Sequence, residues 1–486
     1  MNTKNKLIST AIWAYLDKSI SASFLFILAF IFSKSLSFEQ YGYFIAASLI
    51  VNLLIITSRL GLDNYLVKKQ ETNEDLVSKV LLTVIITSCI VIFVIYLIYA
   101  IIDINDDYNF LFQIITVLSW NILSDNLVAV INSIFFRELN NYKVAKISLI
   151  SWVVSFLLVL IALIYLNPLH ALIFFSLSKS IIRAIISISY ARINIRFINN
   201  LDYFTDFFCF GIPLVISKNL FYLTKKFPQI FCVYFLGPHE LGLLSASLLI
   251  VDYINRLFTS TGQSIWIPIL SKINRENPFR LNEIYFRVRK IQFSLALPIF
   301  VFIFAIRNEL INYILPEKFL NIQQYLPYCL LVGVIISTNF LFIPLLISKS
   351  MTNISLYFSL FKLILSIIFF TTFASFSLTY IIYTLLIIET IYTINSGIFL
   401  SRLTMKRFYK QVKDLFPIFI QSFIAFIFVF STKFIIKDLF SLILIFFAYI
   451  FVYLFSIYFI DKNLFIELKQ LVKLFPNSLN NEIIKS

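Results

Sequence analysis

The sequence predicts an all-α polytopic membrane protein with about fourteen transmembrane helices, in two six-helix lobes followed by two additional helices. Its composition is the first reason: 60% of the 486 residues are hydrophobic and 13% are charged, whereas soluble domains average about 45–50% apolar and about 25% charged residues. Long apolar segments that follow one another almost without interruption are the second reason. An internal repeat, which pairs Gly42 with Gly242 and Lys18 with Lys218, is the third.

The predicted helices are the apolar segments that reach the roughly 20 residues needed to cross a bilayer. They are 8–34, 39–63, 79–103, 110–135, 146–166, 168–191, 206–235, 239–271, 289–313, 323–348, 354–377, 378–401, 414–433 and 438–460. Pro168 separates the fifth segment from the sixth, because proline disfavours helix at the preceding residue. The first segment lacks a small-residue cleavage site, so we expect a retained helix and not a signal peptide.

Lysine and arginine gather in alternate loops, which indicates the orientation in the membrane. With the N-terminus inside, the cytoplasmic loops hold Lys68, Lys69, Lys79, Arg137, Lys143, Lys146, Arg192, Arg196, Lys272, Arg275, Arg280, Arg287, Arg289, Lys290, Lys349, Arg402, Lys406, Arg407, Lys410 and Lys413. The outside loops hold little beyond Lys34, Lys318, Lys433 and Lys437. We therefore expect both termini in the cytoplasm. We attribute the net charge of +15 to the lysine and arginine residues of the cytoplasmic loops, and we therefore expect no nucleic-acid partner.

The repeat defines the predicted domains. Besides the glycines and lysines, Ala46, Leu49, Ile50 and Val51 correspond to Ala246, Leu249, Ile250 and Val251. Six helices before the repeat give two lobes of the same orientation, 1–200 and 201–405, related by an axis along the membrane normal. The two additional helices occupy 406–460. In the tail, 461–486, the apolar residues Leu464, Leu468, Leu471 and Phe475 have helical spacing, which favours an amphipathic segment on the inner membrane surface.

Cationic residues lie inside several predicted helices, where an ionised side chain is costly unless it faces a water-filled cavity or a partner. Lys18 lies roughly 15 Å into its helix at 1.5 Å per residue, near the midplane of a core about 30 Å thick. The candidates for a cationic, substrate-binding cavity are Lys18, Lys179, Arg183, Lys218, Lys225, Lys226 and Arg256. Snorkelling to the interface is the alternative for Lys226 and Arg183. Structural pairing with a carboxylate of the same lobe is the alternative for Lys18 and Lys218, with Asp125 a candidate partner for Lys18.

Three carboxylates within apolar segments, Asp125, Asp252 and Glu389, are candidates for ion coupling. Proton relays in transporters use such groups, so coupling to H⁺, Na⁺ or the membrane potential is expected. Asp252 is four residues before Arg256, which leaves a simple ion pair as an equal alternative. Lys362 is either a partner or another pore charge.

No catalytic or metal-binding pattern is present in the sequence, so we expect no enzyme, cofactor or metal site. His170 and His239 stand alone in predicted outside turns. The four cysteines, Cys89, Cys209, Cys232 and Cys329, lie in apolar segments without metal or disulfide spacing.

Four short motifs resemble a known family. Residues 36–44 (LSFEQYGYF) are similar to a turn written LGPEEYGLY, and residues 235–247 (FLGPHELGLLSAS) are similar to its second-half counterpart FLGPEELGLYSAA. Residues 61–67 and 267–271 are similar to the patterns GL-x-x-ALV and P-x-LS. On these residues the chain resembles Wzx-type flippases of O-antigen and capsule repeat units, a polysaccharide biosynthesis family in the MATE-like superfamily that also holds the lipid II flippases. Ser37 and His239 depart from the pattern.

The resemblance implies two six-helix lobes around a cationic cavity that Lys18 and Lys218 would line. It implies alternating access that carries an undecaprenyl-diphosphate-linked oligosaccharide to the outer leaflet of the bacterial cytoplasmic membrane, for O-antigen, capsule or exopolysaccharide synthesis. Membrane lipids, a polysaccharide polymerase and a chain-length regulator are the other expected partners. The alternatives are a MATE-type ion-coupled multidrug exporter, which would need an acidic cavity, and a polysaccharide polymerase or ligase, which would need a large outer loop.

Overall fold

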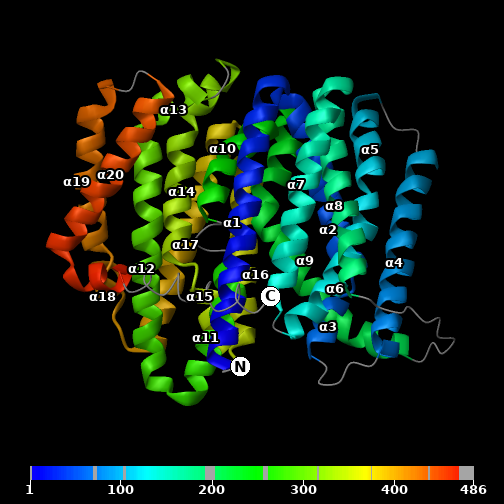
Figure 1. Ribbon diagram of the computed structural model, residues 1–486, viewed down its shortest axis with the longest axis horizontal. Helices are drawn as coiled ribbons and strands as arrows, with labels where there is room; N and C mark the ends of the chain where they lie inside the picture. Colours follow the sequence, from blue (N-terminus) through cyan, green and yellow to red (C-terminus); the bar gives the residue numbers. More distant parts are fainter. Residues whose placement is uncertain are drawn as a thin grey trace. The chain divides into compact units, whose positions relative to one another are not determined.

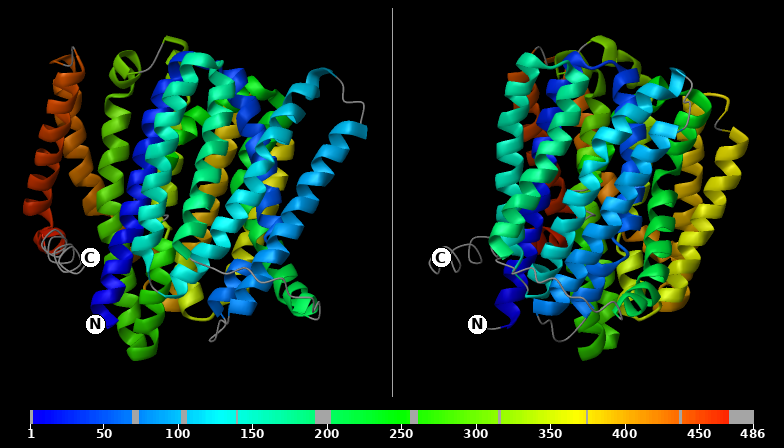
Figure 2. Two further views of the ribbon diagram at one scale, coloured as in Figure 1. Left: turned by 45° about the vertical axis from the view of Figure 1, so that its right-hand side comes forward. Right: turned by 90° about the vertical axis from the view of Figure 1, so that its right-hand side faces the viewer.

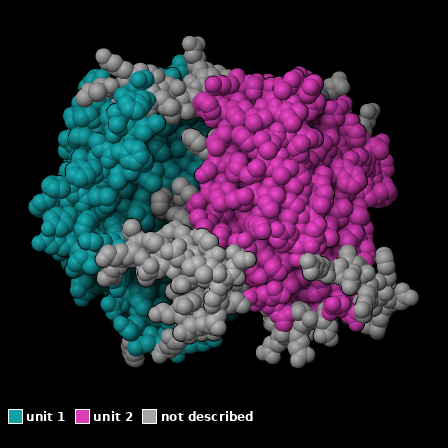
Figure 3. Space-filling model, in the orientation of Figure 1, with its two compact units in different colours: residues 1–9, 246–486 teal, residues 10–245 magenta. Residues whose placement is uncertain are grey.

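The computed structural model describes residues 3–68, 74–101, 106–138, 140–191, 203–255, 261–314, 317–373, 375–435 and 438–469. These residues form helices, and no β-strand occurs among them (Figure 1). The chain folds into two compact units, coloured separately in Figure 3. The N-terminal unit comprises Thr10–Ser245, and the C-terminal unit comprises Met1–Ser9 and Ala246–Ser486. The predicted all-α membrane fold is therefore confirmed.

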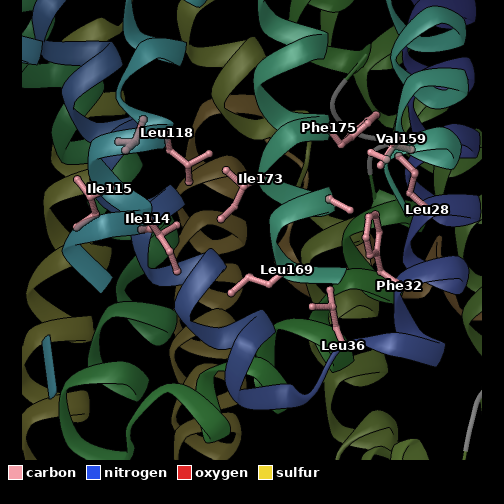
Figure 4. Close-up of a cluster of buried hydrophobic side chains, with 14 of the residues drawn as sticks. Leu28, Phe32, Leu36, Ile114, Ile115, Leu118, Val159, Leu169, Ile173 and Phe175 are labelled. Carbon is pink, nitrogen blue, oxygen red and sulfur yellow. The ribbon is translucent and has the colours of Figure 1, made fainter. Parts of the chain in front are cut away.

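The N-terminal unit is built from the first nine helices and the start of the tenth. They are α1 (Thr3–Ser35), α2 (Phe38–Ser58), α3 (Leu62–Lys68), α4 (Glu74–Ile101), α5 (Asp106–Leu118), α6 (Trp120–Arg137), α7 (Asn141–Tyr165), α8 (Pro168–Ala191), α9 (Tyr203–Leu236) and α10 (Pro238–Asn255). Figure 4 shows part of its main apolar core, in which Phe32 of α1, Ile115 of α5, Val159 of α7 and Phe175 of α8 are buried. Helices α6, α7 and α8 lie side by side, as the cyan to turquoise ribbons in both views of Figure 2 show.

The C-terminal unit contains the remaining helices. They are α11 (Thr261–Glu276), α12 (Pro278–Ala305), α13 (Arg307–Ile314), the 3₁₀ helix η2 (Glu317–Gln324), α14 (Leu326–Thr338), α15 (Phe342–Ser348), α16 (Thr352–Phe373), α17 (Leu378–Thr404), α18 (Phe408–Lys413), α19 (Phe416–Thr432), the 3₁₀ helix η3 (Lys433–Ile435) and α20 (Leu439–Ile460). Aromatic contacts join two helices in one of its cores, where Phe302 of α12 contacts both Phe446 and Tyr449 of α20.

Within the described residues, eleven helical segments are long and apolar enough to cross a membrane. Each corresponds to one predicted segment, and Pro168 begins a new helix as expected. The predicted segments 8–34, 206–235 and 239–271 are not among the eleven, so the count of fourteen is not confirmed. They fall on α1, on α9 and on α10 with α11.

The first turns of α2 and α10 cross each other, and a glycine of the internal repeat lies on each helix at the crossing. A Cβ atom on Gly42 would lie 1.7 Å from the carbonyl oxygen of Pro238, and one on Gly242 would lie 1.9 Å from the carbonyl oxygen of Phe38. Each helix therefore presses its backbone against the glycine of the other. Only glycine permits this approach, which explains physically why the two halves share a glycine at this place.

The compact units divide the chain at a different point from the predicted lobes. Helix α9, assigned to the second lobe 201–405, packs on α2 and α3 in the N-terminal unit. That division describes packing, and the repeat boundaries stay a prediction. In the predicted tail, Leu464 is buried in the core formed by α12, α19 and α20, and Arg287 of α12 pairs with Glu467 at 2.7 Å. Leu471 and Phe475 lie outside the described residues.

Helix α20 is fixed to α12 at a proline. Pro298 has no N–H, so the carbonyl of Ser294 one turn earlier loses its intrahelical donor. The hydroxyl of Tyr453 donates to this carbonyl oxygen at 2.7 Å, and the hydroxyl of Tyr449 donates to the carbonyl oxygen of Pro298 at 2.7 Å. Both tyrosines are buried. The two additional helices are therefore part of the C-terminal unit and satisfy a backbone group of α12.

Candidate charged site at a broken helix

The second transmembrane segment is broken near its C-terminal end. Helix α2 stops at Ser58 and α3 starts at Leu62, although Phe38–Leu66 is one membrane span. Between them, Leu60 and Gly61 have left-handed φ values of 52° and 66°, a conformation that is strained for leucine. The break frees backbone groups that an intact helix would pair. In transporters, discontinuous helices of this kind form substrate and ion sites.

Helix α9 accommodates the break through a glycine of its own. A Cβ atom on Gly211 would lie 2.3 Å from the carbonyl oxygen of Leu60, so the missing side chain gives the kinked backbone its room. On the other side of the kink, a Cβ on Gly61 would lie 2.6 Å from Leu214. Two turns further along α9 stands Lys218. The close approach therefore brings this lysine to the broken helix.

Three charged side chains meet at the break. Lys218 Nζ donates to both carboxylate oxygens of Asp63 at 3.1 Å, and Arg59 Nη1 lies 3.6 Å from Asp63 Oδ2. The side chains of Lys218, Arg59 and Asp63 are 35%, 21% and 16% exposed. Two cations thus share one carboxylate, and the group carries one excess positive charge. The lysine is the most accessible of the three.

Buried, uncharged side chains hold this site in place through hydrogen bonds. Asn126 of α6 is completely buried, and its Oδ1 accepts from Arg59 Nε at 3.1 Å. Its Nδ2 donates to the hydroxyls of Ser58 at 2.8 Å and Ser88 at 3.0 Å. One amide therefore uses both ends to connect α6 to α2, to α4 and to the arginine. A fully bonded buried amide of this kind fixes the direction of the guanidinium.

The predicted cations have different surroundings. Lys179 Nζ lies 4.7 Å from the ring centre of Trp152, a cation–π contact that stabilises a charge beside an apolar core. Arg183 Nε is buried and has no hydrogen-bond partner among the described residues. Lys225 is exposed, and Lys226 is half-buried. The side chain of Lys18 and all of Arg256 lie outside the described residues.

The predicted carboxylates also differ from one another. Asp125 of α6 accepts from Ser180 Oγ of α8 at 2.9 Å. Glu389 of α17 pairs with Lys362 of α16 at 2.5 Å, and its side chain is 7% exposed. Asp252 is half-buried on α10. The structure thus makes Lys362 a partner of Glu389, which was one of the two roles considered for it.

A second broken segment, in the C-terminal unit, is held by a buried arginine. Helix α14 ends at Thr338 and α15 begins at Phe342, within the span Leu326–Ser348. Arg289 of α12 is 8% exposed, and its Nε donates to the carbonyl oxygen of Thr338 at 2.8 Å. A cation is favourable beside the free carbonyls of a helix C-terminus. Arg289 is therefore bound to backbone and buried, unlike the partly exposed Lys218.

The comparison with known families decides where this chain belongs. The family model described as "Polysaccharide biosynthesis protein" matches residues 31–324, which include the broken helix, Lys218 and both crossing glycines. The chain belongs to this family. Among curated proteins the sequence has no match.

Solved structures share the fold of this polysaccharide biosynthesis protein. The lipid II flippase MurJ, in an inward closed conformation, aligns with a TM-score of 0.70 at 14% identity and covers 93% of this chain and 96% of its own. An outward-facing multidrug resistance transporter of the MATE family aligns at 0.58 and 12% identity, covering 83% and 96%. A MOP superfamily transporter from Pyrococcus furiosus, described as having a binding pocket of reverse polarity, aligns at 0.59 and 13% identity, covering 85% and 96%.

Sequence reasoning missed Arg59 and Asp63 as site residues of this polysaccharide biosynthesis protein. Both lie at the end of a predicted segment, 39–63, where charged residues normally reach the interface. A usable signal was present: Leu60-Gly61 stands between an arginine and an aspartate spaced four residues apart. Among the described residues, no group of three or more His, Cys, Asp or Glu side chains could hold a metal ion.

Proposed function

We propose that this polysaccharide biosynthesis protein is a flippase that moves polyprenyl-diphosphate-linked oligosaccharide repeat units from the inner to the outer leaflet of the bacterial cytoplasmic membrane. The observation that carries the proposal is the convergence of Lys218 and Arg59 on the single carboxylate of Asp63. A diphosphate offers the same anionic oxygens in larger number. Lysine binds phosphate as a point charge, and arginine binds it with two parallel hydrogen bonds.

Asp63 holds the site while no substrate is bound. Two neighbouring cations without a counter-charge would repel each other, and the carboxylate neutralises part of their charge. An entering diphosphate replaces Asp63 as the partner of Lys218, so the lysine exchanges one anion for another and is never left bare. Alternating access then carries the paired diphosphate outward. The structural relation to a lipid II flippase and the family membership support this proposal.

Ion coupling is assigned to Asp125 in preference to Glu389. Glu389 already has Lys362 at 2.5 Å, so a cation of the protein occupies the place that a coupling ion would take. Asp125 has a neutral hydroxyl as its partner. We therefore propose H⁺ as the coupling ion. A polysaccharide polymerase and a chain-length regulator remain the proposed protein partners, along with membrane lipids.

Transport in proteoliposomes tests the proposed function. The substrate is a polyprenyl-diphosphate oligosaccharide with a fluorophore on the sugar, and an impermeant quencher reports which leaflet holds it. We expect quenching of the inner pool only in vesicles that contain the protein, with at least a tenfold faster rate than in empty vesicles. The same vesicles should not move a cationic dye, because the described site is cationic. Dye transport without lipid movement would instead identify a multidrug exporter.

Cysteine labelling tests the orientation that this export direction requires. In a background with the four native cysteines replaced by alanine, Asn167→Cys should react with an impermeant thiol reagent from outside, and Met405→Cys should not. Both positions are exposed, and they lie between α7 and α8 and after α17. The excess of arginine and lysine around Met405 favours an inside position for it. The opposite labelling pattern would contradict both the orientation and the outward direction.

A further inference from the structure

Helices α6 and α8 share a polar seam that is separate from the charged site. Asn121 Nδ2 of α6 donates to Ser176 Oγ of α8 at 3.1 Å, and Ser180 Oγ of α8 donates to Asp125 Oδ1 of α6 at 2.9 Å. Both pairs have the same sequence separation of 55 residues. A constant separation means that the two helices run parallel and keep one register. The same register places Ser187 opposite Asn132.

Four buried polar atoms along this seam have no hydrogen-bond partner among the described residues. They are Asn121 Oδ1, Arg183 Nε, Ser187 Oγ and Asn132 Oδ1. Asn121 and Asn132 are 7% exposed and Ser187 is 0% exposed. A buried polar group without a partner costs about 1–3 kcal/mol. Four of them on one helix interface indicate that a polar ligand satisfies them.

The chemistry of the four atoms fits water better than an ion. Amide oxygens accept hydrogen bonds, Arg183 Nε only donates, and the hydroxyl of Ser187 can do both. A metal ion is disfavoured, because the seam offers it only one carboxylate and also holds the cation of Arg183. A polyanion is disfavoured as well, because the carboxylate of Asp125 and two amide oxygens would repel it. Water both donates and accepts, and buried waters typically make about three hydrogen bonds to such groups.

We propose that the α6–α8 seam holds a file of water molecules that conducts protons between the C-terminal ends of these helices and Asp125. The positive-inside bias places those ends at the cytoplasm. A hydronium ion at the mouth gives up a proton, each water in turn accepts one proton and donates another, and the last donates to a carboxylate oxygen of Asp125. The carboxylate becomes a neutral acid, and Ser180 remains its partner. The use of this proton for transport rests on the proposed function.

Charged and titratable groups on the neighbouring helices set the background for Asp125. They are Glu39 on α2, Arg59 at the C-cap of α2, and Asp63 on α3. The others are Glu74, Asp75 and Lys79 on α4, Lys143 and Lys146 on α7, and His170, Lys179 and Arg183 on α8. Of these, Arg183 occupies the seam itself, three residues beyond Ser180.

Infrared spectroscopy of the purified protein tests the proton path without any lipid substrate. At a pH where Asp125 is protonated, transfer into D₂O shifts its carboxylic acid band, which Asp125→Asn identifies by removing it. We expect the shift to be at least tenfold slower in Asn132→Leu/Ser187→Ala, because these changes remove the two polar groups nearest the mouth. The double variant should fold, since Asn132 Oδ1 and Ser187 Oγ have no hydrogen-bond partner among the described residues.

Ser155→Ala is the matched control. Ser155 of α7 is also completely buried and also lacks a partner among the described residues, but it lies outside the α6–α8 register. It should leave the exchange rate of Asp125 within twofold of the wild type. An unchanged rate in the double variant, or equal slowing by Ser155→Ala, would overturn the water file. Neither result would bear on whether the protein transports lipid. Conversely, a failed transport assay would not contradict the proton path.

Discussion

Gly42→Ala is expected to destabilise the protein more than any other single-methyl change considered for this chain. The added Cβ would lie 1.7 Å from the carbonyl oxygen of Pro238. A backbone carbonyl cannot turn away as a side chain can, so the first turns of α2 and α10 would have to separate. Overpacking typically costs about 1–3 kcal/mol, and a clash of backbone with backbone falls at or above the top of that range. Thermal unfolding in detergent, followed by size exclusion, measures the loss.

Two further glycines make the expected result specific. Gly242→Ala should have an effect of similar size, since its Cβ would lie 1.9 Å from the carbonyl oxygen of Phe38. Because the two changes open one shared crossing, the double variant should lose less than the sum of the single losses. Gly237→Ala adds a methyl with no neighbour within 4 Å, so only its φ of 87° is strained. If Gly42→Ala unfolds no earlier than Gly237→Ala, the crossing does not hold the fold.

Lys218→Gln is expected to reduce transport of the lipid-linked oligosaccharide by about 10–100-fold. Hydrogen bonds to charged groups contribute about 1.5–3 kcal/mol, and each 1.4 kcal/mol corresponds to a factor of ten. Lys218→Arg should keep part of the activity because the charge remains. Lys34→Gln is the matched control, since it removes an exposed lysine of the same unit at the end of α1. The proteoliposome assay measures all three rates.

Asp63 separates a substrate-binding role of Lys218 from a structural one. If Lys218 only neutralises Asp63, then Asp63→Asn/Lys218→Gln should recover the transport that Lys218→Gln loses. If Lys218 binds the diphosphate, the double variant stays as slow as the single one, although its folding recovers. A double-mutant cycle that records both transport and thermal stability distinguishes these results. Recovery of full transport would contradict the binding role proposed for Lys218.

The sequence predicts those parts of the fold that depend on residues close to one another in the chain. Long apolar segments mark the spans because a helix must satisfy its own backbone in lipid, and the repeated glycines mark the crossing of α2 with α10. The intramembrane position of Lys218 likewise made it a candidate, and Lys362 was considered as a partner charge. These signals need no knowledge of which helices are neighbours.

The pairing of Lys218 with Asp63 could not be predicted in the same way. Their positions are 155 residues apart, and α9 had been assigned to the second lobe. The break at Leu60-Gly61 was missed as well, although Arg59 and Asp63 on either side of it interrupt the apolar run. Lys179 lies on Trp152 for a reason that the sequence also conceals: aromatic residues are abundant, and no spacing shows which ring lies beneath a lysine.

The contact between Pro298 and α20 has a consequence for the construction of chimaeric proteins. Tyr453 supplies the hydrogen bond that the proline withholds from Ser294, so each helix completes the other. A graft that keeps this α12 but takes α19 and α20 from a homologue without a tyrosine at the place of Tyr453 would leave the carbonyl of Ser294 bare. The transplantable piece is therefore the three helices together, although α12 is far from the other two in the chain.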